Sequence, residues 1–146
     1  MLLKKIKAEL INSMKQSNKE SVLAIRNILE KIKTEEVNTK KEIDEDGIIK
    51  IISKYVKQLK DSISQFKAGG RNDLVEKEHN ELKIVEKFLP KQLSYIEIEK
   101  IVTEIIKSIG ASNISDMGKV IKNVMDHTKG AADGKTISDI TRKLLA

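Results

Sequence analysis

The feature that most constrains the fold is the helical spacing of the apolar residues. Apolar side chains recur at this spacing almost from one end of the chain to the other, and Pro90 is the only proline that interrupts them. A period of roughly three to four residues matches one face of an α-helix, whereas a half-buried strand would alternate every second residue. The sequence therefore predicts an all-α fold.

The helices expected before the proline are bounded by polar residues and glycines. The first is expected to end near Gln16, and the second to span residues 19–37. Asp44 is the expected N-cap of a long third helix, which the glycines at 69–70 end, and Asn72 is the expected N-cap of a fourth. The residues predicted to face the core in these helices are Leu3, Ile6, Leu10, Met14, Val22, Ile25, Leu29, Ile32, Ile48, Ile52, Tyr55, Val56, Leu59, Ile63, Phe66, Leu74, Leu82, Val85 and Leu89.

The helices expected after the proline are marked by their caps. Ser94 and Glu97 form a capping-box pattern for a helix that ends at Gly110. Either Ser112 or Asn113 caps the next helix. The residues predicted to face the core in this part of the chain are Met117, Val120, Ile121, Val124, Met125, Ile137, Ile140 and Leu144.

The proline also gives the expected domain boundary. An N-terminal helical domain is expected over residues 1–90, and a small three-helix C-terminal domain over residues 91–146. A helix cannot continue through a proline without losing a backbone hydrogen bond, so the chain is expected to change direction there.

The segment HTKGAADGKT, residues 127–136, resembles a phosphate-binding loop. Its spacing is one residue short of that motif, and a phosphate loop of this kind follows a buried strand. The segment before Gly130 has helical periodicity instead. We therefore interpret Gly130 as a helix stop, Asp133 as the N-cap of a last helix, and the segment as a helix–turn–helix joint.

Composition excludes several kinds of site. The chain has no cysteine, so it can form no disulfide, thiolate metal site or cysteine nucleophile. No apolar run reaches the roughly 18 residues of a membrane span, and the N-terminal sequence lacks the pattern of a secretory signal. These features predict a soluble, cytoplasmic protein without a membrane association, and nothing in the sequence calls for a cofactor.

The residues give no support for an autonomous enzyme. The two histidines, His79 and His127, are the only side chains that titrate near neutral pH without a perturbed environment. Glu76 and His79 have a spacing used in carboxylate-bridged metal bundles, but no second copy of the pattern exists, so no metal site is predicted. No nucleophile, base and oxyanion donor are grouped together, so no catalytic residue is assigned.

The charge of +6 raises the possibility of nucleic-acid binding. Lysine is interleaved with acidic residues nearly everywhere, so a solubilising surface explains the same charge. The RNA-binding candidates are Lys119, Lys122, Lys129, Lys135 and Arg142. A second polar group is either a solvated helix face or a protein-contact surface. Its members are Lys57, Gln58, Asp61 and Ser62. The spacing of Lys57 and Asp61 allows an ion pair between them.

Three longer segments together are typical of a known family. They are VKQLKDSISQFKAGGRNDLVEKE (56–78), FLPKQLS (88–94) and DMGKVIKNVMDHTKGAADGKTISDITRKLL (116–145). Over essentially its whole length the chain resembles the short stand-alone YqeY-like members of the GatB/YqeY family. The last segment is similar to the helical tail of the B subunit of the tRNA-dependent amidotransferase.

This resemblance implies a function for the C-terminal part of the chain. In the amidotransferase subunit the tail helps to engage tRNA, and amide transfer takes place in a separate catalytic domain. The resemblance therefore implies a module that binds tRNA or another structured RNA, or a protein-binding accessory of an amidotransferase. The family is also associated with carbon–nitrogen ligase activity that uses glutamine as amido donor, although this chain has no counterpart of the catalytic domain.

Overall fold

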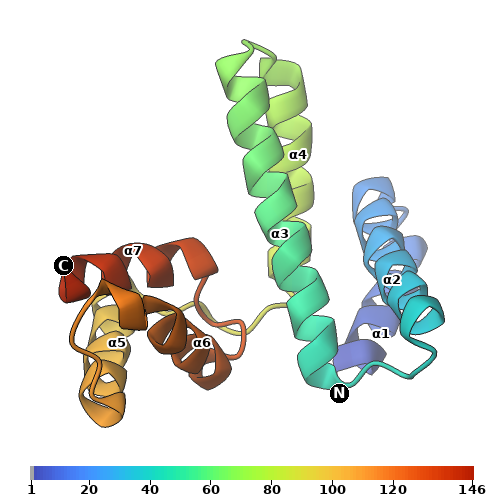
Figure 1. The fold of residues 1–146 in the computed structure, drawn as a ribbon. Helices are drawn as coiled ribbons and strands as arrows, with labels where there is room; N and C mark the ends of the chain where they lie inside the picture. The colour runs from blue at the N-terminus through green and yellow to red at the C-terminus, as the bar shows by residue number, and fades with distance from the viewer. Residues whose placement is uncertain (1) are drawn as a thin grey trace. The chain divides into compact units, whose positions relative to one another are not determined.

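The computed structural model describes residues 2–146, and every regular element in that range is helical (Figure 1). The elements are α1 (Leu2–Lys15), α2 (Lys19–Thr39), α3 (Glu45–Ala68), α4 (Asn72–Glu86), α5 (Tyr95–Ile109), the short 3₁₀ turn η1 (Ile114–Asp116), α6 (Met117–Thr128) and α7 (Gly134–Leu145). The predicted all-α fold is confirmed. The chain divides into two compact units, the first ending at Leu89 and the second running over Pro90–Ala146.

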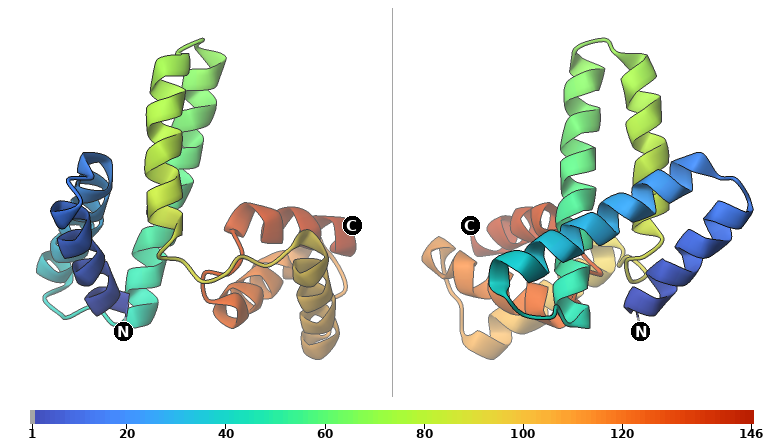
Figure 2. Two further views of the ribbon diagram at one scale, coloured as in Figure 1. Left: turned by 180° about the vertical axis from the view of Figure 1, so that it is seen from behind. Right: turned by 90° about the vertical axis from the view of Figure 1, so that its right-hand side faces the viewer.

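The first unit is built around a long hairpin of α3 and α4. These two helices lie antiparallel, α2 crosses the hairpin, and α1 pairs with α2 (Figure 2). Isoleucine supplies much of the apolar core between them, because its side chains recur on one face of α2 and on one face of α3. The buried residues of this core are Ile6, Ala24, Ile25, Ile28, Ile32, Ile48, Ile52, Tyr55, Val56, Leu59, Leu82, Val85 and Phe88.

Of the two N-caps predicted for the helices of the hairpin, one is confirmed and the other is wrong. The carboxylate of Asp44 accepts a hydrogen bond of 2.9 Å from the backbone N–H of Gly47, so this N-cap is confirmed. The prediction for Asn72 is wrong, because Arg71 occupies the N-cap position of α4 and makes no side-chain cap bond. Gly70 has a φ of 72°, and this left-handed turn lets the carbonyl of Arg71 accept the first helical hydrogen bonds.

The second unit packs three helices around a smaller core. Ser94 and Glu97 form the predicted capping box at the start of α5, and Gly110 ends that helix with a φ of 70°. Asn113 caps η1 by accepting a hydrogen bond from the N–H of Ser115, whereas α6 begins without a side-chain cap. The prediction that Ser112 or Asn113 caps the sixth helix is therefore wrong, because the 3₁₀ turn η1 lies between Asn113 and the start of α6. The buried core residues are Ile98, Val102, Val120, Val124, Ala132, Ile137, Ile140 and Leu145.

The joint between α6 and α7 is a helix–turn–helix connection, as predicted. Lys129 and Gly130 have φ values of 44° and 87°, so the chain makes a left-handed turn at the end of α6. Asp133 then caps α7 by accepting a hydrogen bond of 2.6 Å from the N–H of Thr136. Because a helix, and not a strand, leads into Gly130, the resemblance of this segment to a phosphate loop is superficial.

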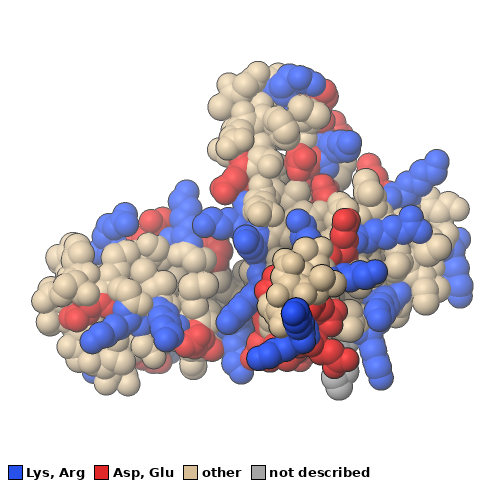
Figure 3. All heavy atoms as spheres, turned by 45° about the vertical axis from the view of Figure 1, so that its right-hand side comes forward, with Lys and Arg blue, Asp and Glu red and all other residues tan. Residues whose placement is uncertain are grey.

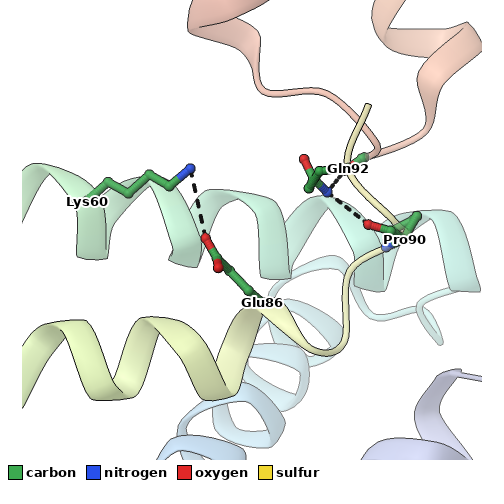
Figure 4. Close-up of polar contacts among 5 residues, drawn as sticks. Lys60, Glu86, Pro90 and Gln92 are labelled. Atoms are coloured by element: carbon green, nitrogen blue, oxygen red, sulfur yellow. Dashed lines mark hydrogen bonds and ion pairs between the residues drawn. The ribbon is translucent and has the colours of Figure 1, made fainter. Parts of the chain in front are cut away.

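The segment before α5 is tied to this joint. The backbone N–H of Leu93 donates to the carbonyl of Ala131 at 2.8 Å. The Gln92 side-chain amide donates at 2.9 Å to the carbonyl of Gly130 and at 2.9 Å to that of Pro90 (Figure 4). These bonds satisfy carbonyls of the turn, so the α6–α7 joint is held from outside as well as by its own cap.

Three residues predicted to face the core are exposed. Met14 is 52% exposed, whereas the neighbouring Ser13 is buried. A helix turns about 100° per residue, so Ser13 lies within about 20° of Ile6 and Met14 about 80° away.

The other two cases lie in the second unit, where Met125 is 47% and Leu144 is 40% exposed. Met125 lies about 140° around the helix from the buried Val120, which explains its exposure. Leu144 lies in the last turn of α7, where Leu145 is buried in its place.

Candidate functional site

The five predicted RNA-binding residues all lie in the second unit and are all exposed. Lys119 and Lys122 lie on α6, Lys129 is the residue that ends that helix, and Lys135 and Arg142 lie in the first and last turns of α7. The two helices that carry them pack against each other.

None of these five cations forms an ion pair within residues 2–146. The ion pairs found in the described part of the chain are Lys60–Glu86 and Arg71–Asp73, and neither involves a member of this group. Figure 3 shows one face of the molecule, on which lysine and arginine side chains project beside aspartates and glutamates. The face shown is therefore mixed in sign, as the interleaved charges of the sequence indicate.

Asp116 is an acidic residue that interacts with one of these candidates, Lys119. The backbone N–H of Ser112 donates to its carboxylate at 3.0 Å, and this bond, with a smaller contribution from the Lys119 ammonium, lowers the pKa of Asp116. Asp116 is therefore ionised at neutral pH and holds a negative charge near Lys119. The Asp116 carboxylate therefore offsets part of the charge of Lys119.

The second predicted group lies on α3. Lys57, Gln58 and Asp61 are exposed and Ser62 is half-buried. No ion pair forms between Lys57 and Asp61, so the pair that their spacing allows is absent from the described structure. The cross-helix pair is instead between the side chains of Lys60 and Glu86, whose Nζ and Oε1 atoms are 4.0 Å apart (Figure 4).

A groove of about 650 Å³ lies between α2, α3 and α4, within the first unit. At its floor three side chains from the three helices meet. The Nδ2 group of Asn27 donates to the Tyr55 hydroxyl and to the carboxylate of Glu81, each at 3.3 Å. The Tyr55 hydroxyl donates to the same carboxylate oxygen. We call this set of three residues the Asn–Tyr–Glu cluster.

The groove perturbs the acids and the phenol that line it. Burial and the hydrogen bond to Glu81 raise the pKa of Tyr55 above its ordinary value. Partial burial and the neighbouring Glu81 carboxylate raise the pKa of Glu78. The Nζ atom of Lys31 lies 4.8 Å from the centroid of the Tyr55 ring, within the range of a cation–π contact.

Sequence reasoning missed this groove. The periodicity predicts that Tyr55 faces the core, and this residue is only 6% exposed. Glu78 and Glu81 fall in the same helical register as the buried Leu82 and Val85, and that register is the signal that could have identified them. Charged residues on an apolar stripe are seldom buried unless they have partners, so their position marks a polar site.

Both histidines lie on the surface. His79 on α4 and His127 in the last turn of α6 are exposed. Among residues 2–146 no three side chains of the metal-ligating kind lie close enough to hold a metal ion. The helices described over that range include none that is both long and apolar enough to span a bilayer.

Comparison with known proteins gives a family match over nearly the full length. A family model described as Yqey-like protein matches residues 3–145. An uncharacterized protein of Schizosaccharomyces pombe is 29% identical over 91 residues, which cover 62% of this chain and 74% of that protein. A protein of Pyrenophora tritici-repentis named "Altered inheritance of mitochondria protein 41, mitochondrial" is 28% identical over 142 residues, covering 94% of this chain and 77% of that protein.

Proposed function

The chain belongs to the YqeY-like protein family, and on that premise we propose that it is a helical module that binds tRNA or another structured RNA and has no catalytic centre of its own. The contact is made by the unit Pro90–Ala146. Residues 116–145 of this unit are the segment that resembles the tail of the amidotransferase B subunit. The RNA is held through its phosphates, which orient a partner without reading its sequence.

The observation that carries this proposal is the exposure of the five basic side chains and the absence of ion pairs to them within residues 2–146. They are exposed, and none forms an ion pair in the described structure. A lysine or arginine that forms no ion pair neutralises a phosphate without first breaking one, although at Lys119 the carboxylate of Asp116 supplies an opposing charge. The displaced counterions then favour binding by their release.

The test is the salt dependence of tRNA affinity. We expect the logarithm of the binding constant to fall linearly with the logarithm of salt concentration, by about 0.7 to 0.9 for each phosphate neutralised. Replacing all five residues with alanine is expected to remove most of that slope. Fluorescence anisotropy of labelled tRNA over a salt series measures both quantities.

The matched control is the variant Lys100→Ala with Lys107→Ala. Both lysines are exposed in the same unit but lie on α5, not on the two helices that carry the five candidates. This variant is expected to bind tRNA nearly as wild type does. The proposal fails if tRNA affinity is undetectable at low salt, or if the five-alanine variant binds as tightly as the control.

A second candidate function rests on the group on α3. Lys57, Gln58, Asp61 and Ser62 have no hydrogen bond or ion pair through their side chains in the described structure, and three of them are exposed. They are therefore available to a protein partner. The alternative we propose is an accessory of a glutamine-dependent amidotransferase that docks through this group.

Co-purification tests the alternative. The double variant Lys57→Glu with Asp61→Lys is expected to lose amidotransferase subunits that wild type retains. The matched control is Lys50→Glu with Glu76→Lys, which reverses the same two charges at exposed positions elsewhere on α3 and α4. Recovery of the same subunits with both variants would exclude this group as the contact.

The cytoplasmic location stays a prediction. It rests on the absence of cysteine, which is usual in a reducing compartment. The relative from Pyrenophora tritici-repentis carries a mitochondrial name, which describes that protein. Fractionation of cells followed by immunoblotting of this chain decides the question.

A further inference from the structure

We propose that the groove between α2, α3 and α4 is a binding site for a linear polyamine, whose ammonium groups lie along its carboxylates and against the face of the Tyr55 ring. The site lies in the first unit, so it is separate from the proposed RNA contact. Its volume of about 650 Å³ falls in the range of roughly 300 to 1,000 Å³ typical of sites for small molecules.

The charge of the groove selects a cation. It is lined by four carboxylates and two ammonium groups, those of Glu30, Glu35, Glu78, Glu81, Lys31 and Lys54. The groove therefore has an excess of negative charge although the chain as a whole carries +6. Glu81 is fixed by hydrogen bonds from both Asn27 and Tyr55, so its carboxylate is already positioned before a ligand arrives.

A separate observation identifies the kind of cation. The ammonium of Lys31 already lies 4.8 Å from the centroid of the Tyr55 ring. An alkylammonium over a ring, with carboxylates beside it, is the arrangement by which proteins recognise organic amines. The hydroxyl of that ring donates to Glu81, which leaves the ring richer in electrons and a better acceptor for a cation. Lys31 therefore acts as an internal occupant that an external amine would displace.

The spread of the carboxylates favours a linear ligand with several charges. Glu30 and Glu35 lie on α2, about 7.5 Å apart along the helix axis, since each residue rises about 1.5 Å. Glu78 and Glu81 lie on α4, across the groove. Ammonium groups separated by short methylene chains can reach acids spaced in this way, whereas one compact cation can reach only some of them.

The emission of Tyr55 provides a direct probe. The chain has two tyrosines and no tryptophan, so the variant Tyr95→Phe leaves Tyr55 as the only strong fluorophore. Spermidine is titrated into this variant, freed of nucleic acid and held at constant ionic strength. A saturable change in Tyr55 emission, matched by a saturable heat in calorimetry, is expected. No saturable change would overturn the proposal.

Variants of the acids test the carboxylates. In the same background Glu81→Gln is expected to weaken spermidine binding about fivefold, because one charge contact is lost. Glu76→Gln is the matched control, since Glu76 is exposed on the same helix and does not line the groove. Glu30→Gln, outside the Asn–Tyr–Glu cluster, gives the same test if Glu81→Gln does not fold. Equal affinity in groove and control variants would overturn the proposal.

Removal of the internal occupant tests the ring. Lys31→Met is expected to tighten spermidine binding about fivefold, through the loss of a competing cation as well as a repelling charge. Lys54→Met removes the same charge from the same groove but leaves the ring covered, so its effect is expected to be smaller. Equal tightening in the two variants, or displacement of spermidine by Mg²⁺ at equal charge concentration, would show a general acidic surface and overturn the proposal.

Discussion

Lys129 combines a strained backbone with a proposed ligand contact. Its φ of 44° is in the left-handed region, which costs a residue with a Cβ about 1 kcal/mol or more relative to glycine. Lys129→Gly is therefore expected to be about 0.5 to 1 kcal/mol more stable than Lys129→Ala. Urea denaturation measures this difference. Both variants lose the same charge, so both are expected to weaken tRNA binding equally.

The pair also separates folding from binding. If the two variants differ in stability but have equal tRNA affinity, the contribution of Lys129 to binding is its ammonium. A tRNA affinity that follows stability would show that the residue acts through the shape of the α6–α7 joint. Equal stability of the two variants would contradict the strain argument.

Ionisation of Tyr55 is expected to lower the free energy of unfolding as pH rises in alkaline solution. Its pKa is raised in the folded state, so above pH of about 10 the unfolded chain releases this proton before the folded chain does. The contribution of Tyr55 is complete below that pH and is lost as pH rises, at about 1.4 kcal/mol per pH unit.

The comparison uses Tyr55→Phe, which cannot ionise. At neutral pH this variant is expected to be about 1 kcal/mol less stable than wild type, because it lacks the hydroxyl that bonds Glu81. Urea titrations from pH 8 upward are expected to show this deficit shrink above a pH of about 10. Tyr95→Phe serves as the control, since Tyr95 is exposed. A deficit that stays constant with pH would contradict the prediction.

At the scale of one element, the capping box of α5 makes the clearest prediction. The Ser94 hydroxyl accepts from the N–H of Glu97 at 3.2 Å, and the Glu97 carboxylate accepts from the N–H of Ser94 at 2.9 Å. Ser94→Ala leaves one helix donor unsatisfied and is expected to cost about 1 kcal/mol. Ser108→Ala, at an exposed position of the same helix, is expected to change stability by only a few tenths of a kcal/mol.

The urea midpoint of each variant, at an unchanged m-value, measures this effect. A midpoint for Ser94→Ala that equals that of Ser108→Ala would mean that water replaces the lost cap bond. The same experiment with Glu97→Gln, which keeps an acceptor, separates the hydrogen bond from the charge.

The elements were largely predictable because their signals are local. Asp44, Ser94 and Asp133 each cap the helix that the sequence assigns to them, since a cap needs only the next three residues. The prediction that Asn72 is an N-cap is wrong because of a residue that precedes it, outside the three residues that a cap involves. The preceding Gly70 completes the turn early, so the helix starts one residue before the polar side chain could cap it.

The groove was not predictable in the same way. Asn27, Tyr55 and Glu81 are separated by 26 to 54 positions in sequence, and each lies on a different helix. Periodicity places a residue on the inner face of its own helix, but which residues meet there depends on how the helices cross.

At the scale of the whole molecule, the two cores have no residue in common. Ile28 belongs to the core of the first unit and Ile137 to that of the second, and both are fully buried. We propose that the units are separate folding domains. Truncation of a buried isoleucine to alanine costs about 2 to 5 kcal/mol, and in separate domains that cost is confined to one unit.

Hydrogen exchange resolved by peptide tests this proposal in the intact chain. Ile137→Ala is expected to speed exchange throughout α5, α6 and α7 and to leave α1 to α4 as protected as in wild type. Ile28→Ala is expected to give the reverse pattern, and the two variants control for each other because they remove the same atoms. If either variant lowers protection in both units together, the two units unfold cooperatively as one body. That result would contradict the proposal that they are separate folding domains.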